Sequence, residues 1–114
     1  MGQDKYPEKT GAELIAEERL RQVDLEGYSL EHDISWNRPD QFLKAAVAYV
    51  LTAIGGRYSQ TATSWWPKEW DPAMFKPKDF FRDLVRAGAL IAAAIDWKIF
   101  NEKKFIKDTK ESHE

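Results

Sequence analysis

Residues 42–54, with the sequence FLKAAVAYVLTAI, are apolar on almost every side of a helix, since only Lys44 and Thr52 are clearly polar. A helix of this kind is normally covered by other helices on more than one side. Pro39 is a favoured residue in a first helical turn and Gly55 ends the pattern, so we expect a helix from about Pro39 to Gly55. The rest of the chain must supply the helices that bury it.

A helix is predicted before this run, from about Gly11 to Asp24 or Leu25. Thr10 and Glu13 have the spacing of a capping box, in which each side chain satisfies a free backbone N–H of the other residue. The polar stripe of this predicted helix is typical of a solvated face and includes an i,i+4 pair of Glu17 and Arg21. Its apolar face comprises Ala12, Ile15, Ala16, Leu20 and Val23.

Asp79 is well placed to cap a third main helix, whose apolar residues form two faces. The face predicted to be the core comprises Phe81, Leu84, Val85, Gly88, Ile91, Ala92, Ile95 and Ile99. A weaker patch on the other side comprises Ala87, Leu90, Ala94 and Trp97. The weaker patch suggests a self-association surface, with a homo-oligomer formed through Leu90 and Trp97.

These patterns predict an all-α fold, a compact bundle of three main helices with a loop rich in Trp and Pro across one end. The loops leave room for a short fourth helix. Residues 1–9 are expected to be a flexible arm, residues 10–100 a single helical domain, and residues 101–114 a charged tail that frays.

Composition excludes several classes of function. The chain has 17 Lys and Arg against 19 Asp and Glu, a net charge of -2, so no specific nucleic-acid binding is expected. The absence of cysteine excludes a thiol nucleophile and a disulfide framework. No apolar run is long enough to span a bilayer, and the N-terminus lacks the apolar core of a signal peptide. We therefore expect an intracellular protein without a membrane partner.

Arg19 is an anomaly, because helical periodicity places it in the middle of an apolar face. A guanidinium there must reach water or a carboxylate, since an unpaired buried charge is costly. One interpretation is a structural ion pair with Glu26, Asp33 or Asp96. The other is an arginine that binds an anion.

The connection EGYSLEHD, residues 26–33, contains Tyr28, His32 and Asp33. A histidine can act as a general base or bind a metal when a carboxylate orients it. Neighbouring side chains point apart in most backbone conformations, however, so a structural turn with a locally bonded His32 explains the segment equally well. Both interpretations stay open.

The aromatic loop, residues 64–77 with the sequence SWWPKEWDPAMFKP, contains Trp65, Trp66, Trp70 and Phe75 among three prolines. Its tryptophans can stack on a flat ligand while a neighbouring cation neutralises phosphate. Alternatively, the prolines stiffen the segment and its rings close a small core. In this second interpretation, which we favour, the loop forms one wall of a pocket.

Four segments occur in a characteristic order: GAELIAEERLRQVDLEGYSLEHD, LKAAVAYV, WWPKEW with FKPKD, and RDLVRAGALIAAAID. In these segments, which run from Gly11 to Asp96, the chain resembles a family of short, uncharacterised phage and prophage proteins. Members of that family carry further carboxylates where this chain has Ile34 and Ala94. The resemblance implies a phage-type accessory protein in the cytoplasm of a bacterial host cell, and it supplies no activity or cofactor.

The expected function is non-enzymatic binding of a small anionic or nucleotide-like ligand, or of a host protein. The candidate binding residues are Arg19, Tyr28, His32, Asp33, Trp66 and Trp70. One alternative is a metal-assisted nucleotide hydrolase that uses His32, Asp33 and either Glu17 or Glu18, and another is a structural subunit that self-associates. The carboxylate pattern of MazG-type all-α pyrophosphohydrolases is interrupted at Arg21 and Ala93, which disfavours the hydrolase.

Overall fold

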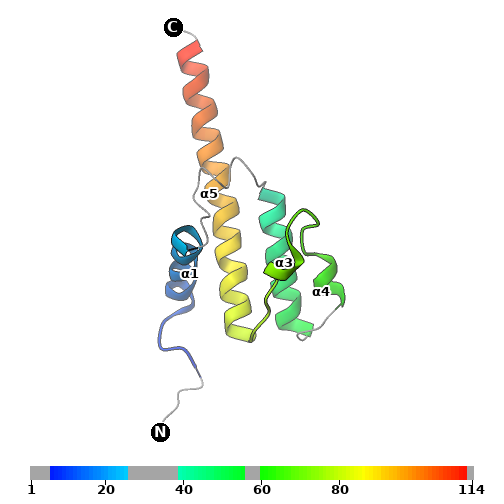
Figure 1. Cartoon of the computed structure of the whole chain (residues 1–114). Coiled ribbons are helices and arrows are strands. Elements are labelled where there is room, and N and C mark those ends of the chain that lie inside the picture. Colours follow the sequence, from blue (N-terminus) through cyan, green and yellow to red (C-terminus); the bar gives the residue numbers. More distant parts are fainter. Residues whose placement is uncertain (1–5, 26–38, 56–59, 113–114) are drawn as a thin grey trace.

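The computed structural model describes residues 6–25, 39–55 and 60–112. The chain forms α1 (Gly11–Leu25), α3 (Pro39–Gly55), the short α4 (Gln60–Ser64), a 3-10 turn η1 (Pro72–Met74) and the long α5 (Phe80–Ser112). α5 packs against α1 on one side and α3 on the other, and α4 packs on α3 (Figure 1). The described residues contain no strand, so the predicted helical bundle is confirmed, including its short fourth helix.

Local capping explains where α1 begins. The Glu13 N–H donates to the Thr10 hydroxyl at 3.2 Å, and the Thr10 N–H donates to the Glu13 carboxylate at 2.8 Å. This is the predicted capping box, and it satisfies backbone donors that the first helical turn leaves free. Pro39 and Gly55 mark the two ends of α3, as the sequence indicates.

Two carboxylates organise the start of α5. The predicted cap, Asp79, accepts from the Arg82 N–H at 2.8 Å. The buried Asp83 accepts from the Lys78 N–H, also at 2.8 Å, and so ties the end of the aromatic loop to the helix. Negative charge at this end of a helix is also favoured by the helix dipole.

The core between α3 and α5 is built on small side chains. Ala45, Ala48 and Ala93 are completely buried, which allows the two helices to approach closely. The buried cluster comprises Phe42, Ala45, Ala46, Ala48, Tyr49, Trp66, Ala87, Leu90, Ala93 and Ala94. The aromatic loop thus contributes to the same core as the two long helices.

The predicted association surface at Leu90 and Trp97 is wrong, because this side of α5 packs inside the chain. Leu90 is only 6% exposed and belongs to the core cluster, and Trp97 packs against that cluster. The alanines on this side let α3 approach more closely than the bulkier isoleucines would. The smaller apolar patch of α5 is therefore the main helix interface.

The face of α5 predicted to be the core is only partly covered. Val85 is buried and Gly88 meets Ile15 of α1, but the isoleucines further along the helix are exposed. The exposed members of the predicted face are Phe81, Ile91, Ile95 and Ile99. The prediction of these four as core residues is wrong, because α1 meets this face at Gly88 and leaves Phe81 and the three isoleucines at least 40% exposed.

The inward side of α1 is partly polar, although an apolar face was predicted: Ile15 faces α5, but it shares this side with polar residues. Leu20 is 62% exposed, whereas Glu18 and Gln22 are buried. Glu17 forms an ion pair with Lys9, and Arg21 pairs with Glu18. The predicted i,i+4 pair of Glu17 and Arg21 is therefore replaced by pairs with other partners.

The charged C-terminal segment is helical to Ser112, so its predicted fraying is wrong. This part of α5 extends beyond the other helices (Figure 1). Lys98 and Glu102 lie 3.6 Å apart in an i,i+4 pair, which stabilises an exposed helix weakly. None of the described helices is long and apolar enough to cross a membrane.

Gly88 permits the contact between α1 and α5. A Cβ atom at this position would lie 2.5 Å from Cδ1 and 2.8 Å from Cγ1 of Ile15. We expect Gly88→Leu to lower the free energy of unfolding by about 1–3 kcal/mol, despite its better helix propensity. Urea denaturation tests this, and adding Ile15→Ala should recover part of the loss. Equal losses with and without Ile15→Ala would contradict the contact.

Candidate ligand-binding cleft

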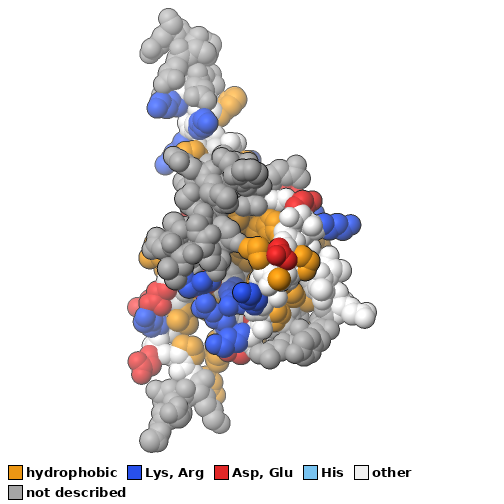
Figure 2. All heavy atoms as spheres, in the orientation of Figure 1, with side chains coloured by type: hydrophobic (Ala, Val, Ile, Leu, Met, Phe, Trp, Pro, Cys, Tyr) orange, Lys and Arg blue, Asp and Glu red, His pale blue; other side chains and the backbone are white. Residues whose placement is uncertain are grey.

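A cleft opens between α1 and the aromatic loop, with α3 and α5 at its base. Its volume is about 310 Å³. Figure 2 shows basic side chains gathered on this face, between the lower part of α1 and the body of the bundle. The lining residues are Glu18, Arg21, Gln22, Tyr49, Trp66, Trp70, Met74, Lys76, Arg86 and Leu90. The cleft therefore combines an aromatic wall with several charged groups.

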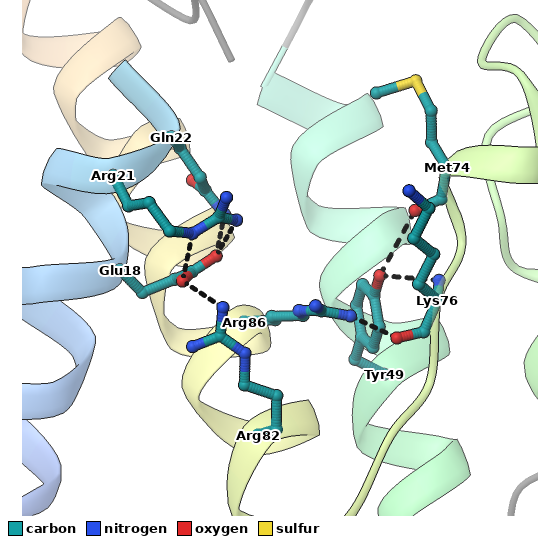
Figure 3. Close-up of polar contacts among 8 residues, drawn as sticks. All are labelled: Glu18, Arg21, Gln22, Tyr49, Met74, Lys76, Arg82 and Arg86. Atoms are coloured by element: carbon teal, nitrogen blue, oxygen red, sulfur yellow. Dashed lines mark hydrogen bonds and ion pairs between the residues drawn. The ribbon is translucent and has the colours of Figure 1, made fainter. Parts of the chain in front are cut away.

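Glu18 is the centre of the polar wall, although only 2% of its surface is exposed. Arg21 donates to the two carboxylate oxygens at 2.9 and 2.7 Å, in a two-pronged pair. Arg82 of α5 lies 2.9 Å from the same carboxylate, and the Gln22 amide donates to it at 3.4 Å. One buried carboxylate thus holds two guanidinium groups at the edge of the cleft (Figure 3).

The pKa of Glu18 reflects a balance between burial and its cationic neighbours. Burial raises this pKa, but the hydrogen bond from Arg21 and the charges of Arg82, Arg21 and Arg86 lower it more. The net result is a pKa below the ordinary value for a glutamate. Glu18 is consequently ionised at neutral pH and fixes the positions of the arginines around it.

Tyr49 organises the opposite wall. Its hydroxyl accepts from the Lys76 N–H at 3.1 Å and donates to the Met74 carbonyl at 3.5 Å. Burial raises the pKa of Tyr49, so the phenol stays protonated and keeps its donor. These bonds hold the aromatic loop against α3.

Arg86 connects the two walls and lies between Glu18 and Tyr49 in Figure 3. Its guanidinium lies over the Tyr49 ring, 5.8 Å from the ring centre, and donates to the Lys76 carbonyl. A planar guanidinium can stack on an aromatic face while its remaining N–H groups point elsewhere. Arg86 is therefore held in place at the base of the cleft.

The aromatic wall is packed edge to face. Trp66 lies 5.9 Å from the Tyr49 ring and 5.4 Å from Trp70, and Trp70 lies 5.7 Å from Phe42, all in T-shaped contacts. Trp66 is 9% exposed and its indole N–H donates to the Asp71 carbonyl at 3.2 Å. The favoured interpretation of the loop as a core-closing strap is confirmed, and the same loop forms one wall of the cleft.

The balance of charge in and beside the cleft is positive. Among the described residues at the cleft, four cationic side chains stand against the one acidic side chain of its lining, Glu18. The four cations are Arg21, Lys76, Arg82 and Arg86. A cleft of this polarity with partly desolvated walls attracts small anions.

The predicted binding residues are only partly brought together. Trp66 and Trp70 line the cleft, as proposed from the sequence. Arg19 instead extends to Asp96 of α5, with its Nε 3.3 Å from the carboxylate, which is one of the ion pairs that the sequence suggested. Arg19 does not line the cleft. The predicted residues Tyr28, His32 and Asp33 lie outside the described residues.

Sequence reasoning missed the polar half of the cleft. Glu18, Arg21 and Gln22 share one side of α1 by i,i+3 and i,i+4 spacing, and Arg82 and Arg86 are four residues apart on α5. Two arginines one helical turn apart, facing a lone acidic residue, form a recognisable charge pattern. Of these residues, only Arg21 was predicted to lie in a solvated stripe, because the sequence does not indicate which side of α1 faces α5.

The carboxylates in the described part of the chain do not gather around a common point. No group of three or more His, Asp or Glu side chains among them is arranged to hold a metal ion. Glu18 is held by two arginines, and Glu17 pairs with Lys9. The other residues named for the alternative hydrolase, His32 and Asp33, fall outside the described part.

Comparison of this chain with models of protein families, with curated proteins and with solved structures finds no match. The functional argument therefore depends on the cleft itself.

Proposed function

We propose that this chain is a non-enzymatic, phage-type accessory protein of the bacterial cytoplasm that binds a small anionic or nucleotide-like ligand in the cleft. The observation that carries the proposal is the meeting of Arg21, Lys76 and Arg86 with the rings of Trp66 and Trp70 around one opening. Cations neutralise phosphate, and aromatic rings contact a base or another flat group.

Electrostatics favours an anion over a cation as the ligand. Glu18 is already surrounded by guanidinium groups, and Asp83 is occupied by a backbone N–H. An incoming cation would meet Arg21, Lys76 and Arg86 at the lining of the cleft. An incoming phosphate or carboxylate would gain charge-assisted hydrogen bonds from the same groups.

The size of the cleft bounds the ligand. A volume of about 310 Å³ falls at the lower end of the range of small-molecule sites. Pyrophosphate or a nucleoside monophosphate suits this space better than a dinucleotide. The aromatic wall distinguishes these two, because only the nucleotide has a base to place against it.

Thermal denaturation in the presence of pyrophosphate, nucleoside monophosphates and cyclic nucleotides tests the proposal. A ligand at 100 times its Kd should add about 2.7 kcal/mol to the free energy of unfolding and raise the Tm by several degrees. Stabilisation without a divalent metal supports a binding protein. Stabilisation that requires Mg²⁺ would instead favour the alternative of a metal-assisted hydrolase, and no stabilisation by any of these anions would contradict the proposal.

Lys76→Ala is the sharpest variant for the site. The side chain lines the cleft, whereas the contacts to Tyr49 and Arg86 use only the backbone of this residue. We expect about a tenfold increase in ligand Kd with little change in stability, because one charge-assisted contact is lost. Lys44→Ala is the matched control, since Lys44 is exposed on α3 and does not line the cleft. Equal effects of the two variants on Kd, measured by calorimetric titration, would show that only net charge matters.

A further inference from the structure

The charge of the cleft indicates which form of anion it takes. Three cationic side chains line the cleft, those of Arg21, Lys76 and Arg86, together with one acidic side chain, that of Glu18. Glu18 is ionised at neutral pH, because its pKa is lowered from the ordinary value for a glutamate. Cations in the lining therefore exceed carboxylates by two. Because Coulomb attraction grows with the charge of the ligand, this lining favours a dianion over a monoanion.

The three cations come from three different parts of the fold. Arg21 belongs to α1, Lys76 to the aromatic loop and Arg86 to α5. Figure 3 shows Arg86 between the other two. A carboxylate has two oxygens in one plane, whereas a phosphate monoester has three terminal oxygens that accept hydrogen bonds. Donors from three elements suit the phosphate group better.

Arg86 keeps donors for such a ligand. A guanidinium carries five N–H groups. Arg86 donates through Nη1 to the Lys76 carbonyl, and its guanidinium lies over the Tyr49 ring. These contacts hold the guanidinium in place without using all of its N–H groups. A fixed cation loses little conformational freedom when an anion binds to it.

The aromatic wall suits an uncharged ring attached to the phosphate. Trp70 is half-buried and Met74 is 40% exposed, and both residues line the cleft. Indole rings and thioether groups both make favourable contacts with aromatic rings. A cationic wall that faces such a surface has the polarity of a nucleoside monophosphate.

We propose that the ligand of the cleft is a phosphate monoester in its dianionic form, and that a nucleoside monophosphate is the member of this class that also uses the aromatic wall. This inference rests on the proposed function and narrows it. Phosphate diesters carry a single negative charge, so cyclic nucleotides fall outside the class.

A phosphate monoester changes its charge near neutral pH. Its second pKa is about 6, so it is mostly a monoanion at pH 5 and mostly a dianion at pH 7.5. The charged or titratable groups of the lining are Glu18, Arg21, Tyr49, Lys76 and Arg86. The pKa of Glu18 is lowered and that of Tyr49 is raised, both away from this range, and lysine and arginine side chains titrate well above it. The change of charge therefore belongs to the ligand.

Calorimetric titration of the full chain with adenosine monophosphate at pH 5 and pH 7.5 tests the proposal. If only the dianion binds, the Kd should be about tenfold lower at pH 7.5, in proportion to the fraction of dianion. Cyclic adenosine monophosphate keeps one negative charge at both pH values, and its Kd should change by less than about twofold. At pH 7.5 the monoester should bind at least about tenfold more tightly than the cyclic nucleotide. Circular dichroism should show a folded chain at both pH values.

Ribose 5-phosphate distinguishes the phosphate from the base. This compound has the same phosphate group without a base, so its Kd should show the same dependence on pH but be higher than that of adenosine monophosphate. Equal Kd values for the two would overturn the nucleotide as the ligand, while the shared pH dependence would support the class of phosphate monoesters.

Lys76→Gln tests whether the excess of positive charge sets the preference. The variant removes one cation from the lining and keeps the backbone contacts to Tyr49 and Arg86. The preference for adenosine monophosphate over the cyclic nucleotide at pH 7.5 should fall at least about threefold. Lys44→Gln, at an exposed position of α3 outside the lining, should leave the preference unchanged. An equal preference in the two variants would contradict the role of charge.

Equal affinities for the two nucleotides at pH 7.5 would overturn the dianion and leave the proposed anion site intact. A Kd for adenosine monophosphate that does not fall between pH 5 and pH 7.5 would have the same meaning. The absence of binding by either nucleotide and by ribose 5-phosphate would overturn this inference together with the nucleotide-like ligand of the proposed function.

Discussion

Trp66→Ala is expected to lower the free energy of unfolding by about 3–5 kcal/mol, the range found when a large aromatic residue is removed from a core. Trp66 is 9% exposed, contacts the rings of Tyr49, Trp70 and Phe75, and bonds to the Asp71 carbonyl. The loss should appear in urea denaturation followed by circular dichroism. The same substitution would also remove one wall of the cleft.

Trp65→Ala is the matched control for this variant. Trp65 is the preceding residue in the same loop, but it is 43% exposed and is absent from the core cluster. We expect it to cost less than about 1 kcal/mol. Equal losses for the two tryptophans would mean that the loop is not anchored through Trp66, and the description of this wall would then be incorrect.

Glu18→Ala should cause the second-largest loss of folding free energy among the single substitutions described. Removing this carboxylate leaves Arg21 and Arg82 facing each other beside a buried site, with no countercharge between them. We expect a loss of about 2–4 kcal/mol, slightly less than for a fully buried pair because both arginines are one-third exposed. Glu17→Ala, at an exposed neighbouring position, should cost no more than about 1 kcal/mol. Chemical denaturation of both variants at pH 7 provides the comparison.

The pH dependence of stability provides a second readout of Glu18. Its pKa is lower in the folded chain than the ordinary value of 4.5, so the folded state binds a proton less readily than the unfolded state. The stabilisation is therefore present above pH 4.5 and is lost as the pH falls through the folded pKa. Glu18→Gln should reduce the loss of stability on acidification. An unchanged pH profile would contradict the ion-pair account of this wall.

The starts of the three main helices and the end of α3 could be predicted, because each has a local chemical signal. Thr10 and Glu13 start α1, Pro39 starts α3, Gly55 ends it, and Asp79 caps α5. These signals involve residues within one helical turn of each other. No knowledge of the neighbouring helices was needed to interpret them.

The faces could not be predicted in the same way, because burial depends on which helix packs where. α5 has apolar residues on two sides, and the alanines at 93 and 94 pack against α3 while Ile91 and Ile95 stay exposed. Counting bulky apolar residues favours the isoleucine side. Close helix packing favours the alanine side instead, and the periodicity of a single helix does not distinguish the two.

Only the aromatic wall of the candidate site could be predicted, because the polar wall depends on which helices pack together. Trp66 and Trp70 stand out through residue type alone, so the aromatic wall was found. Glu18, Arg21 and Arg86 are ordinary residues for the surface of a helix, and they become a site only when α1 and α5 lie side by side. Arg19 stood out in the sequence, but its carboxylate partner Asp96 explains it structurally.

The most direct test of the proposed cleft is the indole N–H region of the NMR spectrum during a titration with pyrophosphate and then with adenosine monophosphate. Trp66 and Trp70 line the cleft, whereas Trp65 and Trp97 do not. We expect the nucleotide to shift the first two signals progressively and to leave the signals of Trp65 and Trp97 in place, with smaller shifts for pyrophosphate. Shifts confined to Trp65 or Trp97, or no shift at millimolar ligand, would contradict an anion site between α1 and the aromatic loop.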